Sequence, residues 1–176
     1  MAGLVYIEAG YFYAFDNGKG VTKEEQRSNQ PPQHSGPGPA DLQSFATYQA
    51  WFKRFMGVTF PEGEVRQPMN VPPTVPEAIQ AGQKKFVGIR VPVLAIYAVP
   101  PDLGPWVHES EDPTVRAAAA AFSAKQLALT EKQIKAFEDG VPGARVVRLQ
   151  NANHYAFLSN EVDVLREMRS FLRTLK

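Results

Sequence analysis

One histidine stands where the sequence predicts a strand to end and a helix to begin. His154 lies in residues 151–157 (NANHYAF), after a β-rich stretch that ends at Leu149 and before a helical pattern that begins near Ser159. Loops at the carboxyl ends of parallel strands are where α/β proteins build their sites. An imidazole there can accept and return a proton near neutral pH. His154 is therefore a candidate general base, and a surface histidine without a role is the alternative.

Other reaction chemistries find little support in the residue types. The chain has no cysteine, which excludes disulfides, thiolate metal sites and a cysteine nucleophile. His34, His108 and His154 lack the paired spacing of zinc ligands. Gly18–Lys19–Gly20 lacks both the pattern of a phosphate-binding loop and a strand leading into it. We expect no metal and no cofactor.

Hydrophobic periodicity predicts the elements that must position the histidine. Strands are expected at residues 4–8, 91–98 and 144–149, and helices at 41–56, 76–85, 112–140 and from about 159 to the end. Asp41 and Asp112 are the expected caps of their helices, and Gly57 the expected end of the first. Residues 16–39, rich in glycine and proline, are expected to be irregular. The run 51–56 (WFKRFM) is expected to form core or an apolar wall.

The order of these elements predicts an α/β fold. Strands that alternate with helices favour a parallel sheet covered on both faces. Three strands make a small sheet, and one edge would have no neighbour. We expect a single partial domain over residues 1–176, with an insertion at about 16–85 and a C-terminal core at 86–176. Self-association through the open sheet edge is a further expectation.

The stretches 91–97 (VPVLAIY), 144–149 (ARVVRL) and 151–155 (NANHY), with a long helix between the first two, resemble the last third of α/β-hydrolases. Residues 4–11 (LVYIEAGY) are similar to the strand that follows the nucleophile-bearing unit of that family, and residues 16–85 stand where the family inserts its lid. The resemblance covers essentially the whole chain from Ala2 onward. It implies a partial α/β-hydrolase fold in which His154 completes a Ser-His-acid triad.

The resemblance also implies an acid that orients the imidazole. Asp102, shortly after the second strand, stands at the matching position, although the turn before it (AVPP) departs from the family pattern. Some members of the fold place the acid after an earlier strand, which makes Glu8 and Asp16 alternatives. The acid would accept a hydrogen bond from the imidazole and stabilise the imidazolium.

The nucleophile of such a triad has no counterpart in the sequence. It belongs in G-x-S-x-G on a strand-to-helix turn, and no serine of the chain has glycines at both flanking positions. We therefore expect the C-terminal part of a hydrolase of ester, amide or similar bonds in a small molecule, inactive alone. A strand that begins at residue 4 suggests a chain cut upstream. The alternative is a non-catalytic binding module derived from half of a hydrolase.

Composition limits the partners. A net charge of +1 and a pI near 8.0 provide no basic stripe for nucleic acid. No apolar run is long enough to cross a bilayer, and we expect no membrane partner. The resemblance implies a small-molecule substrate if an N-terminal half completes the chain. The sequence carries no targeting signal and leaves the compartment undecided.

Overall fold

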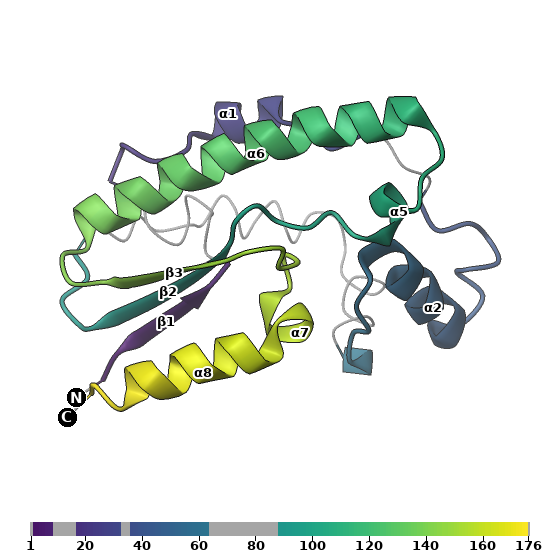
Figure 1. The fold of residues 1–176 in the computed structure, drawn as a ribbon. Helices are drawn as coiled ribbons and strands as arrows, with labels where there is room; N and C mark the ends of the chain where they lie inside the picture. Colours follow the sequence, from purple (N-terminus) through teal and green to yellow (C-terminus); the bar gives the residue numbers. More distant parts are fainter. Residues whose placement is uncertain (1, 9–16, 33–35, 64–87, 176) are drawn as a thin grey trace. The chain divides into compact units, whose positions relative to one another are not determined.

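The computed structural model describes residues 2–8, 17–32, 36–63 and 88–175 (Figure 1). The chain divides into two compact units. Unit 1 holds Met1–Gln30, Lys84–Asp102 and Ala121–Lys176, and unit 2 holds Pro31–Gln83 and Leu103–Ala120. The helix predicted at 76–85 lies outside the described residues.

Unit 1 is built on a three-stranded parallel sheet in the order β1-β2-β3. Its strands are β1 (Leu4–Ile7), β2 (Val93–Ala98) and β3 (Arg145–Leu149). In register, Tyr6 lies opposite Ala95, and Ala95 lies opposite Val146. All three predicted strands are confirmed, with β2 beginning two residues later than expected. The protein is therefore a mixed α/β structure with its helices on both faces of a small parallel sheet.

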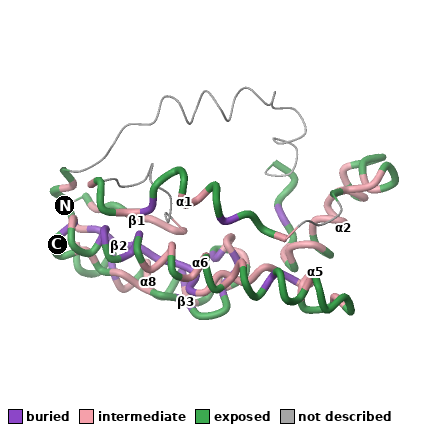
Figure 2. The backbone as a smooth tube through the Cα atoms, turned by 90° about the horizontal axis from the view of Figure 1, so that it is seen from above, coloured by how far each residue is buried: buried purple, intermediate pink, exposed green. Residues whose placement is uncertain are grey.

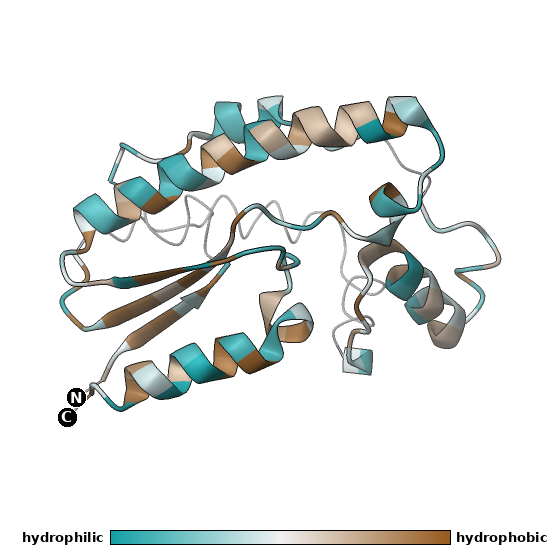
Figure 3. Ribbon diagram, in the orientation of Figure 1, coloured by the Kyte–Doolittle hydropathy of each residue, from teal (hydrophilic) through white to brown (hydrophobic). Residues whose placement is uncertain are grey.

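The central strand β2 separates two apolar cores. All six of its residues are buried (Figure 2), which explains why the sequence reads as one apolar run rather than an alternation. One face of β2 packs against α6 (Pro113–Gly140) and the other against α8 (Glu161–Leu172). The first core contains Val93, Ala95, Tyr97, Ile134 and Phe137, and the second Leu94, Ile96, Ala98, Val164 and Phe171. The brown colour of the sheet interior in Figure 3 reflects these apolar residues.

The long helix α6 begins where the sequence predicts. Asp112 Oδ1 accepts a hydrogen bond from the Thr114 N–H at 2.7 Å, which satisfies a donor of the first turn, and Pro113 occupies the first helical position. Five consecutive alanines after Arg116 then favour the helix by propensity.

The 17–30 segment runs along α6 and is not wholly irregular. Residues 23–28 form a short helix, α1 (Lys23–Ser28), with a capping box between Thr22 and Glu25. The prediction of an irregular 16–39 stretch is wrong here, because the local Thr-x-x-Glu signal outweighs the surrounding glycines and prolines. Buried Gln133 of α6 accepts a hydrogen bond from the Val21 N–H at 2.9 Å and holds the segment to the helix.

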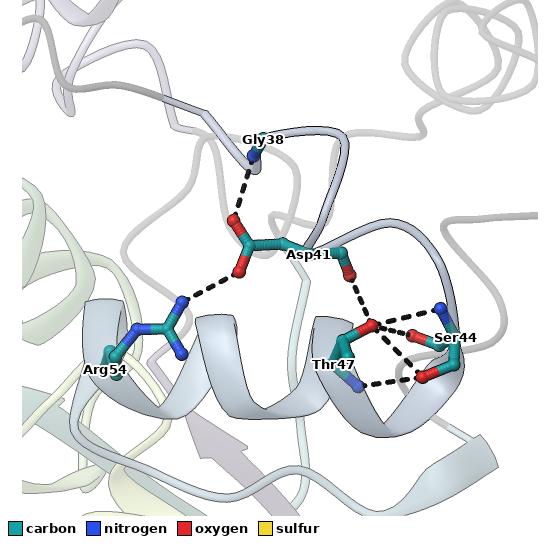
Figure 4. Close-up of polar contacts among 5 residues, drawn as sticks. All are labelled: Gly38, Asp41, Ser44, Thr47 and Arg54. Carbon is teal, nitrogen blue, oxygen red and sulfur yellow. Dashed lines mark hydrogen bonds and ion pairs between the residues drawn. The ribbon is translucent and has the colours of Figure 1, made fainter.

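In unit 2, helix α2 (Phe45–Met56) starts later than predicted. Ser44, not Asp41, is its cap, and Ser44 and Thr47 form a reciprocal capping box (Figure 4). Asp41 instead accepts hydrogen bonds from the Gly38 N–H at 3.0 Å and from Arg54 at 2.8 Å. Asp41 therefore ties the preceding turn to the helix instead of capping it. Gly57 ends α2 in the left-handed conformation, as expected.

The aromatic residues of α2 stack on one another. Tyr48 lies parallel to Trp51, Trp51 to Phe55, and Phe55 to Trp106, with ring centroids 5.3–5.7 Å apart. Trp106 belongs to the short helix α5 (Pro105–His108), which the sequence did not predict. Gly104 precedes α5 with φ +98°, and a Cβ there would lie 2.6 Å from the Phe55 carbonyl oxygen, so only glycine allows this approach.

The chain ends with α7 (Ala156–Ser159) followed directly by α8. The predicted C-terminal helix is confirmed, while the short α7 before it was not expected. Among the described residues, no helix combines the length and the apolar content that a membrane span requires.

Candidate functional site

The candidate site lies where the three parallel strands of unit 1 end. Glu8 follows β1 directly, and its backbone adopts φ 53°, a left-handed conformation that is rare and costly for a residue with a long side chain. The Glu8 N–H donates to the Ile96 carbonyl at 2.8 Å, so the pairing of β1 with β2 continues up to this residue. The backbone therefore turns at Glu8, where the pairing of β1 with β2 ends.

The carboxylate of Glu8 is shared between the other two strands. Oε1 accepts a hydrogen bond from the Ala98 N–H at the end of β2. Oε2 lies 3.3 Å from Nδ1 of His154, in the loop after β3. The Glu8 side chain is 14% exposed and the His154 side chain 41% exposed. The structure therefore brings together a shielded carboxylate and an imidazole that solvent can reach.

This pairing determines which imidazole nitrogen can act as a base. An ionised carboxylate can only accept hydrogen bonds, so a favourable contact requires the proton on Nδ1. Nε2 then carries the lone pair of the neutral ring. The separation of 3.3 Å is slightly longer than an ordinary N–H···O hydrogen bond. Catalytic hydrogen bonds are often long in ligand-free sites and shorten when substrate binds.

The loop that carries His154 is held by polar contacts on both sides of the histidine. Asn153 is 2% exposed, and its Oδ1 accepts a hydrogen bond from the Tyr155 N–H at 3.0 Å. The Asn153 N–H donates to Ser159 Oγ at 3.0 Å, and Ser159 Oγ donates to Asn160 Oδ1 at 2.7 Å. The sequence analysis missed Asn153 and Ser159, although an asparagine directly before the histidine is a recognised signal for a side-chain-closed turn.

The other two candidate acids have different positions. Asp102 follows β2, where its N–H donates to the Ala152 carbonyl at 2.9 Å and its backbone forms a parallel bridge with Asn153. Asp102 therefore lies beside the histidine loop, at the same end of the sheet. Asp16 lies outside the described residues. The carboxylate of Glu8 contacts the imidazole at 3.3 Å.

Four of the described serines form hydrogen bonds that support local structure. Ser44 caps α2, Ser28 Oγ donates to the Glu25 carbonyl, and Ser170 Oγ accepts from Arg145. Ser159 braces the histidine loop. Ser35 lies outside the described residues. In the described part of the chain, no serine stands on a turn from a strand into a helix with a glycine on each side.

The other two histidines do not define a metal site. His108 ends α5 in unit 2 and is exposed, and His34 lies outside the described residues. Within the described ranges, no three side chains of histidine, aspartate or glutamate form a group that could hold a metal ion.

A buried phenol lies on β2 next to the site. Tyr97 is wholly buried in the core beneath α6, and its hydroxyl has no hydrogen-bond partner among the described residues. Burial raises the pKa of Tyr97, and the negative charge of Glu8 raises it further. Tyr97 therefore remains a neutral phenol and cannot supply a base at neutral pH.

Comparisons of the chain with protein-family models, curated proteins and solved structures found no match. Functional inference therefore rests on the geometry of the histidine loop and its acids.

Proposed function

We propose that this chain carries the histidine and acid of a Ser-His-acid hydrolase of the α/β type. The substrate class is an ester, amide or similar bond in a small apolar molecule. His154 Nε2 is the general base, and Glu8 orients the ring from the Nδ1 side. The observation that carries the proposal is the 3.3 Å contact between Glu8 Oε2 and His154 Nδ1 at the carboxyl ends of parallel strands.

The proposed chemistry begins with proton transfer. Nε2 takes the proton of an attacking hydroxyl, and the negative charge of Glu8 stabilises the imidazolium that results. The same proton then passes to the leaving group, which restores the neutral ring. The hydroxyl is proposed to come from a serine outside these 176 residues, because no serine of the sequence stands in G-x-S-x-G. These 176 residues are therefore proposed to be inactive alone.

A chemical probe tests the assignment. The DNA upstream of the first codon is read, and any in-frame segment with strand, G-x-S-x-G and helix is expressed joined to this chain. A fluorophosphonate should label its serine, His154→Ala should abolish labelling, and Glu8→Gln should slow ester hydrolysis about 10²- to 10⁴-fold. Asp102→Asn is the matched variant of the other acid. If it slows ester hydrolysis more than Glu8→Gln does, Asp102 is the acid that orients the imidazole.

The isolated chain gives the complementary test. Incubated with p-nitrophenyl acetate, it should show no turnover above that of free imidazole. Turnover at triad level that His154→Ala abolishes would contradict the proposal that these 176 residues are inactive alone.

A second candidate function is a non-catalytic interaction module. Among the described residues β1 pairs with β2 alone, and β1 carries no charged side chain. Edge strands without charged side chains can pair with a strand of another molecule. Sedimentation velocity distinguishes the two candidates: concentration-dependent association supports the module, and a monomer at all concentrations argues against it.

A further inference from the structure

The histidine loop contains two polar side chains that form hydrogen bonds within the loop. Asn153 lies directly before His154 and is nearly fully buried, while Ser159 lies five positions after His154 and is exposed. Three of their hydrogen bonds join residues between 153 and 160. Bonds within the loop act on the shape of the loop.

We propose that Asn153 and Ser159 are positioning residues that hold the His154 imidazole with Nδ1 facing Glu8. The inference rests on the proposed function, because it assigns the two residues to the same histidine. Neither residue reaches the reacting atoms, so both act through the ring that they orient.

The geometry of Asn153 supports this role. Its Oδ1 accepts the N–H of Tyr155, two positions on, which closes a turn with His154 at its centre. Burial of Asn153 and its bridge to Asp102 fix one end of this turn against the extended sheet. The backbone of His154 is thus restrained on the side from which its ring must reach Glu8.

Ser159 fixes the other end of the loop. Its Oγ accepts a hydrogen bond from the Asn153 N–H at 3.0 Å and donates one to Asn160 Oδ1 at 2.7 Å. The second bond directs the hydroxyl hydrogen toward Asn160, which leaves a lone pair for the Asn153 N–H. The His154 ring itself is 41% exposed. Part of the ring is therefore open to solvent, and restraint of its backbone contributes to its orientation.

The imidazole tautomer is the readout, because loss of stability alone would not change it. At about pH 9 the ring of a histidine is neutral, and its ¹⁵N spectrum distinguishes a proton on Nδ1 from one on Nε2. The wild-type chain should hold the Nδ1–H form at His154, whereas free imidazole side chains favour Nε2–H. The signals are assigned with His154→Gln, since the chain has three histidines.

Glu8→Gln tests the pairing itself. The single oxygen of the new amide remains with the Ala98 N–H, so its NH₂ group faces Nδ1 and can only donate. The tautomer should therefore reverse. If Glu8→Gln leaves the tautomer unchanged, the His154–Glu8 pairing is absent, and both the proposed function and the positioning role are overturned.

Asn153→Ala and Asn153→Asp test the positioning role. The alanine variant should lower the Nδ1–H fraction by about half or more, and the aspartate variant, which keeps an acceptor for the Tyr155 N–H, should restore it. Asn29→Ala removes another buried asparagine of unit 1, one that donates to Gln126, and should retain the wild-type tautomer. A tautomer unchanged in Asn153→Ala, or lost equally in Asn153→Asp, overturns the positioning role and leaves the Glu8 result standing.

Ser159→Ala keeps the test decisive if Asn153→Ala does not fold. Ser159 is exposed, so the substitution leaves the core intact while it removes the acceptor of the Asn153 N–H. A fall in the Nδ1–H fraction supports the proposal, and an unchanged fraction overturns it.

Discussion

At the scale of single residues, Glu8 connects the ends of all three strands. Its N–H and one carboxylate oxygen bind β2, and the other oxygen reaches the loop after β3. The bond to the Ala98 N–H has a consequence for the site, because it fixes which oxygen faces His154. A carboxylate held at one oxygen has lost most of its rotational freedom before it meets the imidazole.

The unpaired hydroxyl of Tyr97 leads to a stability prediction. Removing a buried polar group that has no partner relieves its desolvation penalty. Tyr97→Phe should therefore leave the free energy of unfolding unchanged or raise it by about 1 kcal/mol. Tyr97→Leu, which removes the ring as well, should lower it by about 2–4 kcal/mol because it leaves a cavity.

Urea unfolding followed by circular dichroism measures both Tyr97 variants. A loss of more than about 1 kcal/mol in Tyr97→Phe would mean that the hydroxyl has a hydrogen-bond partner in solution.

The sequence identifies part of the candidate site. It singles out His154 by its place between a strand and a helix, which depends on local pattern alone. The contact with Glu8 spans 146 positions and depends on the order and register of the strands, so the sequence could offer Glu8 only as one of several acids. Asn153 and Ser159 bond to backbone groups of the loop. The asparagine before His154 signals a turn, but the bond to Ser159 depends on how the loop folds back.

At the scale of elements, Gln133 secures the 17–30 segment on α6. Its amide oxygen is the acceptor of the buried Val21 N–H. Gln133→Leu should leave the buried Val21 N–H without an acceptor and lower the free energy of unfolding by about 1–3 kcal/mol. Gln126 lies on the same helix as Gln133, and its side chain accepts a partly buried hydrogen bond from Asn29. Gln126→Ala removes this bond and should lower the free energy of unfolding by about 1 kcal/mol or less.

Hydrogen exchange at the Val21 amide reports the local effect of Gln133→Leu. Exchange should accelerate in this variant and remain slow in Gln126→Ala. Equal protection of Val21 in both variants would show that Gln133 does not hold the segment.

Acid should weaken the same segment through Glu25. The hydrogen bond from Lys132, followed by that from the Thr22 N–H, lowers the pKa of Glu25 from 4.5 to about 2. The unfolded chain binds its proton first as the pH falls, so the stabilising effect is complete above about pH 4.5 and lost as the pH approaches 2. The difference in unfolding free energy between wild type and Glu25→Gln should shrink over that interval.

Lys132→Gln is the matched variant for the Glu25 prediction and should remove the same pH dependence. Both side chains are about 40% exposed, at 38% for Glu25 and 41% for Lys132, so high salt should reduce the effect. A difference that stays constant between pH 4.5 and 2 would contradict the prediction.

The elements that the sequence predicted are those with strong periodicity or propensity. The three strands, α2, α6 and α8 all follow from apolar spacing. The four-residue helices α5 and α7 span about one turn each, which is too short for periodicity to appear. The predicted start of α2 is wrong because Asp41 has the residue type of a cap, whereas Ser44, three residues later, forms the reciprocal contact with Thr47.

At the scale of the whole molecule, the two edges of the sheet differ in charge. Arg148 of β3 forms ion pairs with Glu131 and Glu138 at 3.1 and 3.0 Å, and Arg145 pairs with Glu167. The other edge strand, β1, has the sequence LVYI. Charged side chains protect an edge from strand addition. Among the described strands, β1 is therefore the edge at which we predict that the sheet could extend.

Leu4→Lys tests extension at β1. Leu4 is 40% exposed, so lysine fits without disturbing the core, and its charge opposes edge pairing. If the chain self-associates, the substitution should weaken association about tenfold or more, or ~1.4 kcal/mol. Val162→Lys on α8, at a residue 78% exposed, should leave association unchanged.

Analytical ultracentrifugation over a range of concentrations measures the effect of both lysines. Equal weakening by the two substitutions would show that net charge, not the β1 edge, controls association.

The parallel α/β architecture was predictable because strand and helix patterns alternate along the chain. The division into two compact units was not, since unit 2 joins residues 31–83 to residues 103–120 by packing between segments far apart in the sequence. Such packing depends on tertiary contacts such as the stacking of Phe55 on Trp106.

The left-handed backbone of Glu8 lowers the stability of the fold at a position whose side chain contacts His154. Glycine or asparagine would adopt φ 53° more readily and relieve the strain, but neither offers a carboxylate to His154. Laboratory evolution for thermal resistance alone should therefore drive position 8 toward glycine or asparagine. Selection for turnover in a completed enzyme should retain glutamate there. Sequencing position 8 after each selection would show whether stability or catalysis requires the glutamate.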